Sequence, residues 1–448
     1  MNIDPNEKIR QQFDLMPYPN LPANQTGGDG DRGLILHSFA SAWYAKTQRV
    51  GDRQDLTILD VGCGSGVTTL ALAMANPNSK IIGIDLSEAS LSLARDRLNY
   101  HGFPNAEFHK LPIEELPNLK DKEGLHFDYI NCEDTLYLLN DPVLGLKIMG
   151  AVLAPEGLLR VNVHSLYQRT DFFRAQAFSR LLGFLDRNPT EDEYQQIYAI
   201  MEALGDGTLL KANTWSPSDK SLGFFLANYA IQEDKGFTIP EVFQMLRGSN
   251  LEFVSMINPA DWRLTNLFPE HIPDGFVKFL DHATPEQNLH AYELLHPVNR
   301  LLDIWCGHSG RSAYTEISQW TATMWESATV HLHPILRTEA FFQTLEQAIA
   351  QLRPDSNIQK LHNSKLDSLT VTLCLRFLWK CECKFSELVT YWGVHKPRLE
   401  AYRKVSTTIV SGRITPTGKL SDRQASEELR FLLGELVIDQ LVMIEKDI

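Results

Sequence analysis

A short glycine-rich turn carries the most specific chemistry in the sequence. Residues 60–66 read DVGCGSG and place Gly62, Gly64 and Gly66 at alternate positions. Glycine permits positive φ angles and leaves no side chain to obstruct a ligand that approaches the main chain. A helix that follows such a turn offers free N–H groups to the polar part of a ligand. The turn therefore predicts a site for a ligand that contains a nucleoside.

An acidic residue lies where such a ligand would need one. Asp85 follows Asp60 by 25 residues, at the predicted end of the next strand, where a carboxylate can accept hydrogen bonds from both ribose hydroxyls. Dinucleotide-binding folds use the spacing G-x-G-x-x-G, whose helix faces a pyrophosphate. Here Val67 holds the place of the last glycine of that pattern. The shorter spacing favours a ligand without pyrophosphate.

The elements around the turn alternate between strand and helix. Short apolar runs predict strands at residues 56–61, 80–85, 106–109, 127–132 and 158–164. Helices are predicted between them at residues 67–75, 87–100 and 142–153. This alternation predicts an α/β fold with a doubly wound, Rossmann-like parallel sheet.

The pattern changes after residue 165. Helical segments at 171–204 and 285–305 and strands at 251–254 and 329–334 predict a sheet finished by two late strands. A helix at 426–440 and a strand at 441–444 predict a smaller C-terminal domain, helical and winged-helix-like. The expected division is an N-terminal segment and helix at 1–50, a main domain at 51–336, and a C-terminal domain at 337–448. Helical lid insertions are expected at about 166–236 and 260–325 of the main domain.

These motifs resemble those of class I S-adenosylmethionine-dependent methyltransferases. Residues 58–66 resemble the first motif, and residues 83–87, 111–116 and 131–138 resemble the second, third and fourth. Residues 153–159 are similar to the loop that leads into strand five. The resemblance covers roughly residues 50–165. It implies S-adenosyl-L-methionine as cofactor and methyl transfer (EC 2.1.1.-) as activity.

The resemblance also implies a role for each matched residue. Asp60 and the amides of the turn would hold the methionine end of the cofactor, and Asp85 would hold its ribose. Leu86 and Ile113 would enclose the adenine. The complete implied cofactor set is Asp60, Gly62, Cys63, Gly64, Gly66, Asp85, Leu86, Ile113 and Glu133.

The sequence departs from the family pattern at two places. Pro112 occupies the position of the acid that binds the adenine amino group, so a main-chain group or Glu114 would have to serve. The fourth motif lacks the Asn/Asp-Pro-Pro-Tyr/Phe signature of nucleobase amino methylation, which argues against that chemistry.

Catalysis requires few side chains in this reaction. Methyl transfer from a sulfonium is an in-line displacement, which an enzyme promotes mainly by alignment, and a base is needed only for a protonated acceptor. No catalytic residue is assigned, and the candidates are Glu133, Tyr137 and His164. Arg169 is expected either to bind a substrate carboxylate or to be a solvated surface residue. Tyr18 is expected either in an N-terminal flap over the cofactor or in a surface turn.

Composition narrows the partners and the location. The net charge of −14 argues against nucleic acid and anionic membranes as partners and is compatible with a cationic sulfonium. We find neither a secretory signal nor an apolar run of membrane-spanning length, and six cysteines show no disulfide framework, so a cytoplasmic protein is expected. Two pairs of candidate ligands, Cys306 with His308 and His331 with His333, do not show a complete set of ligands at zinc spacing, and we expect no metal.

The methyl acceptor is left open between a protein side chain and a small metabolite. The C-terminal part resembles regulatory domains of some bacterial protein methyltransferases, which favours a protein. The alternative is a non-catalytic S-adenosylmethionine-binding regulator or scaffold that acts through its C-terminal domain. A nicotinamide-dependent oxidoreductase is a third reading, against which the glycine spacing argues. No oligomeric state is predicted.

Overall fold

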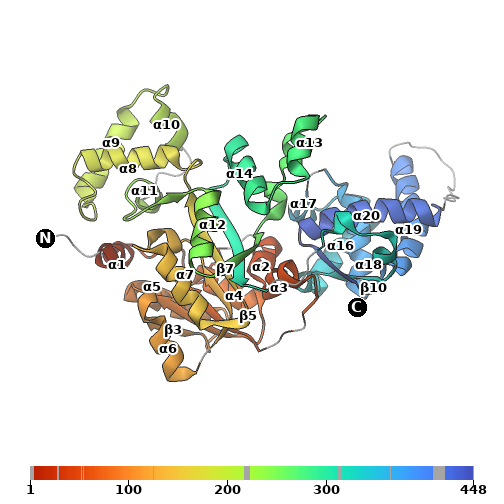
Figure 1. Ribbon diagram of the computed structural model, residues 1–448, viewed down its shortest axis with the longest axis horizontal. Coiled ribbons are helices and arrows are strands. Elements are labelled where there is room, and N and C mark those ends of the chain that lie inside the picture. Colours follow the sequence, from red (N-terminus) through yellow and green to blue (C-terminus); the bar gives the residue numbers. More distant parts are fainter. Residues whose placement is uncertain are drawn as a thin grey trace. The chain divides into compact units, whose positions relative to one another are not determined.

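The computed structural model (Figure 1) describes residues 5–27, 30–51, 53, 55–124, 126–215, 222–310, 315–363, 365–406 and 419–446. The chain divides into two units. The first unit comprises Met1–Gly28, Gln54–Ile257 and Trp262–Gly310. The second unit comprises Asp29–Arg53, Asn258–Asp261 and Arg311–Ile448. The last part of the second unit therefore begins at Arg311, before the predicted boundary at residue 337. The unit also includes Asp29–Arg53, most of which was expected in the N-terminal part at 1–50.

The first unit is built on a sheet with the strand order β3-β2-β1-β4-β5-β8-β7. Strands β1 to β5 are parallel, and β8 runs antiparallel to both β5 and β7. The short β6 pairs with β5 beyond its contact with β4. The strands are β1 Thr57–Val61, β2 Lys80–Asp85, β3 Glu107–Lys110, β4 Phe127–Cys132, β5 Leu153–Ser165, β6 Gly236–Phe237, β7 Leu251–Met256 and β8 Leu301–His308. The predicted doubly wound sheet is confirmed.

The central strands are apolar because both faces of the sheet are covered. Leu59, Ile82, Ile130 and Leu159 are fully buried in one core, and each such side chain contributes about 1.5–3 kcal/mol on burial. Helices follow the strands at α4 Val67–Ala75, α5 Glu88–Tyr100, α6 Leu116–Glu123, α7 Pro142–Val152 and α12 Ile239–Gly248. The N-terminal helix α1 Pro5–Leu15 packs beside α5 (Figure 1).

A helical subdomain is inserted between β5 and β6. It consists of α8 Thr170–Leu181, α9 Glu191–Ala203, α10 Leu209–Thr214 and α11 Leu222–Asn228, which gather at one end of this unit (Figure 1). Its own small core is rich in aromatic rings, for example the stacked pair Phe225 and Tyr229. This insertion occupies the range in which a helical lid was expected.

The predicted final strand of the main sheet was wrong. The segment at 329–334 contains β9 Ala328–Leu332, which pairs with β10 Cys383–Lys384 and β11 Val442–Lys446 in a separate antiparallel sheet of the second unit. The strand that completes the main sheet is β8, inside the segment predicted to be helical at 285–305, where α14 Pro285–Leu295 ends before it. Asp303 interrupts the apolar run of β8, and its pairing with Arg160 explains how a carboxylate is tolerated there.

The second unit combines the three-stranded sheet with helices. The helices include α2 Asp31–His37, α3 Phe39–Thr47, α16 Glu339–Gln351, α18 Ser368–Lys380, α19 Phe385–Ser406 and α20 Asp422–Ile438. The Tyr44 hydroxyl donates to the Ile444 carbonyl and accepts from the Ile444 amide, both at 2.9 Å, which fixes α3 to β11. A mostly helical C-terminal domain was expected, but its attachment to α2 and α3 was not.

The histidines considered for a metal belong to other contacts. His331 lies near Glu382 and Glu445, and the buried His333 hydrogen-bonds to Ser41. Within the described ranges, His, Cys, Asp and Glu side chains do not gather in any group of three suited to a metal ion. Nor does any helix in those ranges have the length and apolar character to traverse a bilayer.

Candidate functional site

Residues from other segments pack against the glycine turn after β1 and limit which side chains it can carry. Gly62 has φ 70°, and a Cβ atom there would lie 2.1 Å from the Thr135 hydroxyl oxygen. Gly64 has φ 51°, and a Cβ atom there would lie 2.4 Å from the Tyr18 carbonyl oxygen. Both positions therefore exclude a side chain by contact as well as by backbone angle.

A cavity of about 370 Å³ opens beside this turn. Its walls come from the turn, the ends of β2 and β4, the loop after β3, helix α1 and the chain that follows α1. Seven of the nine residues implied for the cofactor line this cavity: Gly62, Cys63, Gly64, Asp85, Leu86, Ile113 and Glu133. Burial holds the pKa of the Cys63 thiol well above its ordinary value, so it stays protonated.

Asp60 and Gly66 lie behind the cavity wall instead of in it. Asp60 is 1% exposed and accepts hydrogen bonds from Thr69 on α4, at 2.6 Å, and from Asn131 on β4, at 2.8 Å. Gly66 caps α4 and packs against Ala94 of α5. Both residues therefore stabilise the conformation of the turn. Neither lines the cavity, so neither is placed to contact a ligand there.

Asp85 is held in one position at the wall of the first cavity. One carboxylate oxygen accepts the Gly64 amide at 2.9 Å, and the other accepts the Ser87 amide at 2.8 Å, so the side chain is fixed. Each oxygen keeps a further lone pair for a hydroxyl donor. Leu86 and Ile113 line the same cavity as Asp85, together with Pro112 and the exposed Glu114.

Cofactor affinity should depend on pH through Asp85. Burial raises the pKa of this carboxyl, and the amides of Ser87 and Gly64 offset only part of the rise. A ribose prefers the ionised acceptor, so we expect affinity to be constant at high pH and to fall once the pH drops below this raised pKa. The decline should therefore begin above pH ~4, the ordinary pKa of aspartate.

Calorimetric titrations across a pH series would measure this decline. Asp85→Asn is the matched control, because it removes the titrating group and leaves Glu114 and Glu133 in place. If the parent and Asp85→Asn lost affinity in parallel on acidification, another group would be responsible.

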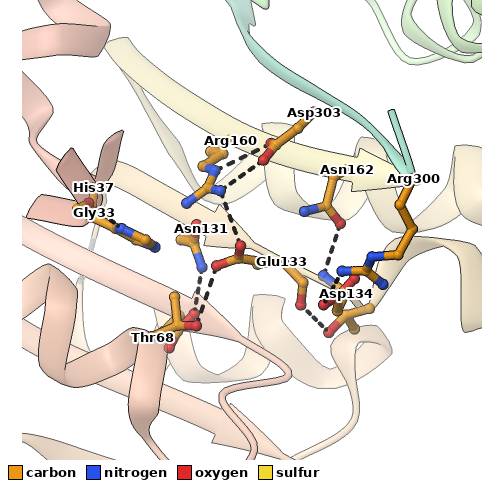
Figure 2. Close-up of polar contacts among 12 residues, drawn as sticks. Gly33, His37, Thr68, Asn131, Glu133, Asp134, Arg160, Asn162, Arg300 and Asp303 are labelled. Atoms are coloured by element: carbon orange, nitrogen blue, oxygen red, sulfur yellow. Dashed lines mark hydrogen bonds and ion pairs between the residues drawn. The ribbon is translucent and has the colours of Figure 1, made fainter. Parts of the chain in front are cut away.

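Glu133 is held by a buried charge network at the end of β4 (Figure 2). One oxygen accepts Thr68 at 3.2 Å, and the other accepts Arg160 of β5 at 3.0 Å. Arg160 is 3% exposed and also pairs with Asp303 of β8 at 2.7 Å. Burial alone would lower the pKa of Arg160, but Asp303 and Glu133 together raise it, so the guanidinium stays charged. Two carboxylates and one guanidinium leave a net negative charge, which suits a cationic ligand.

The chain after α1 covers the glycine turn. We call residues 16–27 the N-terminal segment. The Ser65 amide donates to the Tyr18 carbonyl at 3.1 Å, and the Ser65 hydroxyl donates to the Pro19 carbonyl at 2.7 Å. Arg97 of α5 is fully buried and donates to main-chain carbonyls of the segment and the turn, namely those of Leu21, Pro22, Gln25 and Ser65. The flap expected around Tyr18 is therefore a fixed wall of the cavity.

A second cavity of about 360 Å³ adjoins the first. It lies between the N-terminal segment, α11 and the loop after β4, and Arg300 also lines it. The two cavities share four lining residues: Phe13, Tyr18, Leu21 and Asp134. The two cavities are therefore neighbours, and these four residues border both of them.

The remaining candidates take different places around the second cavity. Tyr137 lines it and lies 3.4 Å from Asp134 through its hydroxyl; burial holds its pKa well above the ordinary value, so the phenol stays protonated. His164 is 1% exposed, stacks under Tyr137 and lines neither cavity. Arg169 is 1% exposed, so it is not a solvated surface residue, and it lies between Asn228 and Asp234.

Sequence reasoning missed the residues that reach the site from distant parts of the chain. Arg160, Asp303 and Arg300 lie on late strands or beside them, and α1 contributes Asn6, Ile9, Arg10 and Phe13 to the first cavity. A charged residue inside an apolar strand, as at Arg160 and Asp303, was the one signal available.

Comparisons with known proteins identify a methyltransferase domain in this chain. A family model described as a methyltransferase domain matches residues 52–200. The chain is 26% identical over 312 residues to an uncharacterised protein of Synechococcus, which covers 69% of this chain and 73% of that protein. It is 30% identical over 110 residues to the ubiquinone biosynthesis O-methyltransferase of Acinetobacter baumannii, which covers 25% of this chain and only 44% of that enzyme.

The fold is shared with a solved structure over most of the chain. PKMT2 from Rickettsia typhi in complex with AdoHcy superposes with a TM-score of 0.57 at 15% identity, which covers 92% of this chain and 76% of that one. The strand order, the glycine turn and the matched domain agree with one another. On these grounds, residues 52–200 of the chain carry a methyltransferase domain, similar to those of class I S-adenosylmethionine-dependent methyltransferases.

Proposed function

We propose that this chain transfers a methyl group from S-adenosylmethionine in the first cavity to an acceptor in the second. The observation that carries the proposal is that the two cavities adjoin and share the lining residues Phe13, Tyr18, Leu21 and Asp134. In-line displacement needs the acceptor and the leaving sulfur on opposite sides of the methyl group. Two adjoining cavities, one for the cofactor and one for the acceptor, suit that arrangement.

The roles of the residues follow from their places around the first cavity. The cofactor supplies an electrophilic methyl group on a sulfonium. Asp85 accepts hydrogen bonds from the ribose, Leu86 and Ile113 enclose the adenine, and Glu114 or a main-chain group near Pro112 meets its amino group. Glu133, backed by Arg160, provides negative charge toward the cationic methionine end. The fit rests on the turn, where a Cβ on Gly62 or Gly64 would collide with its neighbours.

Asp134 is the residue we assign to the acceptor's proton. Its backbone is held at φ 50° with its amide bonded to the Asn162 side chain at 2.8 Å, and the residue lines both cavities. A carboxylate there can orient an acceptor that carries N–H or O–H and accept its proton during transfer. Tyr137 stays protonated and His164 is enclosed, so neither is placed to serve as that base.

The acceptor proposed is a small metabolite or a protein side chain that reaches into the second cavity. The likeness to an O-methyltransferase of ubiquinone biosynthesis supports a small molecule, and it covers 25% of this chain. The volume of the second cavity is suited to a side chain or a compound of similar size.

Parallel calorimetric titrations with S-adenosylmethionine and NAD test the cofactor. We expect micromolar-range binding of S-adenosylmethionine and none of NAD, and the reverse result would overturn the proposal. Transfer of labelled methyl groups into a cell extract, separated into protein, RNA and small-molecule fractions, then identifies the acceptor class. Cofactor binding without transfer to any fraction would favour the regulator alternative.

A further inference from the structure

Arg300 lines the second cavity, and buried polar side chains hold its guanidinium in place. Its guanidinium Nη1 lies 3.0 Å from Nε2 of His164, whose Nδ1 lies 2.7 Å from a carboxylate oxygen of Asp234. The Asp234 side chain is fully buried, and its other oxygen accepts Gln176 at 2.8 Å. A chain of hydrogen bonds thus runs from the Arg300 guanidinium through His164 and Asp234 to Gln176.

The hydrogen-bond directions in this line follow from the ionisation of its members. Burial by itself raises the pKa of Asp234, but the hydrogen bond from His164 and the neighbouring Arg169 bring it below its ordinary value. Burial lowers the pKa of His164, which favours the neutral ring. An ionised Asp234 accepts a hydrogen bond from Nδ1–H of His164. Nε2 of the neutral ring therefore carries a lone pair, and Arg300 donates to it.

The other side of Arg300 faces Asp134 and open space. Its Nη2 donates to Asp134 at 3.1 Å (Figure 2), while Tyr137 stacks on His164 with ring centroids 3.8 Å apart. The Arg300 side chain is 43% exposed and lines the second cavity. In the part of the chain that the structure describes, its remaining N–H groups have no partner. A guanidinium oriented from behind thus retains donors for a ligand.

We propose that Arg300 binds a carboxylate of the methyl acceptor and so selects acidic acceptors for the reaction. This inference rests on the proposed function and names its substrate class. A guanidinium offers two parallel N–H groups that match the two oxygens of a carboxylate. Apolar side chains, among them Phe13, Phe224 and Ile231, line much of the same cavity, so the acceptor carries its carboxylate on an apolar body. Asp134 lies next to Arg300 and within the same cavity, on the side toward the cofactor.

The His164–Asp234 pair acts as a positioning device in this proposal. His164 touches neither cavity, so its effect on an acceptor must pass through its neighbours Arg300 and Tyr137, and of these only Arg300 carries the charge that recognises a carboxylate. A histidine that only filled space could be replaced without changing the preference for acids. A histidine that orients Arg300 could not.

Benzoate and benzamide are the probes, because they share an apolar ring and differ in one charged group. Their binding to the full-length protein with saturating S-adenosylhomocysteine is measured by ligand-observed NMR, which requires no methyl transfer. We expect benzoate to bind at least about 10-fold more tightly than benzamide, as a charge-assisted hydrogen bond provides. Equal binding of the two, or no binding of either, would overturn the proposal.

Variants assign the preference to Arg300. In Arg300→Met the two probes should bind equally, in Arg300→Lys part of the preference should remain, and in His164→Ala it should fall several-fold. Arg174→Met changes an exposed arginine of α8 and should leave the preference intact. A preserved preference in Arg300→Met would overturn the assignment. S-adenosylhomocysteine affinity and thermal unfolding, measured for every variant, report folding, and failure to bind that ligand in the parent would refute the proposed function instead.

Discussion

Asp85→Ala is expected to weaken S-adenosylmethionine binding by at least about 100-fold, because a hydrogen bond to a charged group contributes about 1.5–3 kcal/mol and the ribose offers two. The substitution also leaves the amides of Gly64 and Ser87 without the acceptor that fixes them. The glycine turn would then lose part of its shape together with the ribose contact. Calorimetric titration at neutral pH measures the loss directly.

Two matched variants make this result interpretable. Asp85→Asn keeps one acceptor oxygen without the charge, so its affinity should fall between those of the parent and Asp85→Ala. Asp96→Ala removes an exposed carboxylate from α5, outside the cavity, and should bind the cofactor like the parent. If Asp85→Ala bound as tightly as Asp96→Ala, the assignment of Asp85 to the ribose would be wrong.

The first half of the main sheet was predictable because its signals are local. A strand, a glycine turn and a helix follow one another in residues 57–75, and Asp85 ends the next strand, so spacing alone gave the geometry. The helices predicted at 67–75, 87–100 and 142–153 differ from α4, α5 and α7 by at most one residue at each end. Propensity and periodicity are sufficient wherever the contacts that matter lie within one strand–helix unit.

The predicted strand at 251–254 is β7, but β8 and β9 were not predictable in the same way, because an apolar segment does not specify its partner. β9 has the short apolar pattern of a sheet strand, yet its partners are β10 and β11, more than fifty residues further along the chain. The apolar pattern of β8 is interrupted by Asp303, and aspartate is depleted in strands. Only the presence of Arg160 opposite β8 makes that aspartate compatible with burial.

The second cavity was beyond sequence reasoning for a related reason. Its walls bring together α1, the N-terminal segment, Asp134, α11 and Arg300, which lie up to about 290 residues apart in the chain. No spacing rule connects them. His164 was identified by its place at the end of β5, and the structure shows that this place supports Arg300 instead of facing an acceptor.

Arg160→Met is expected to destabilise the protein by about 3–5 kcal/mol, the usual cost of removing one partner from a buried ion pair. Methionine fills a similar volume, so the cost comes from Glu133 and Asp303, which would remain charged without their guanidinium. Chemical denaturation at neutral pH measures the loss. Arg247→Met is the control, since Arg247 pairs with Glu286 at the surface, where such pairs contribute about 0–1 kcal/mol.

The pH dependence of this variant separates charge from packing. Without Arg160, burial should raise the pKa of Glu133 and Asp303 in the folded state above their unfolded values. The folded state then binds more protons than the unfolded state, so the stability deficit should shrink as the pH falls through the raised pKa. Adding Asp303→Asn to Arg160→Met should recover part of the deficit at neutral pH. A deficit that is the same at every pH, and is unchanged by Asp303→Asn, would show that Arg160 acts through packing and that Glu133 does not owe its position to this network.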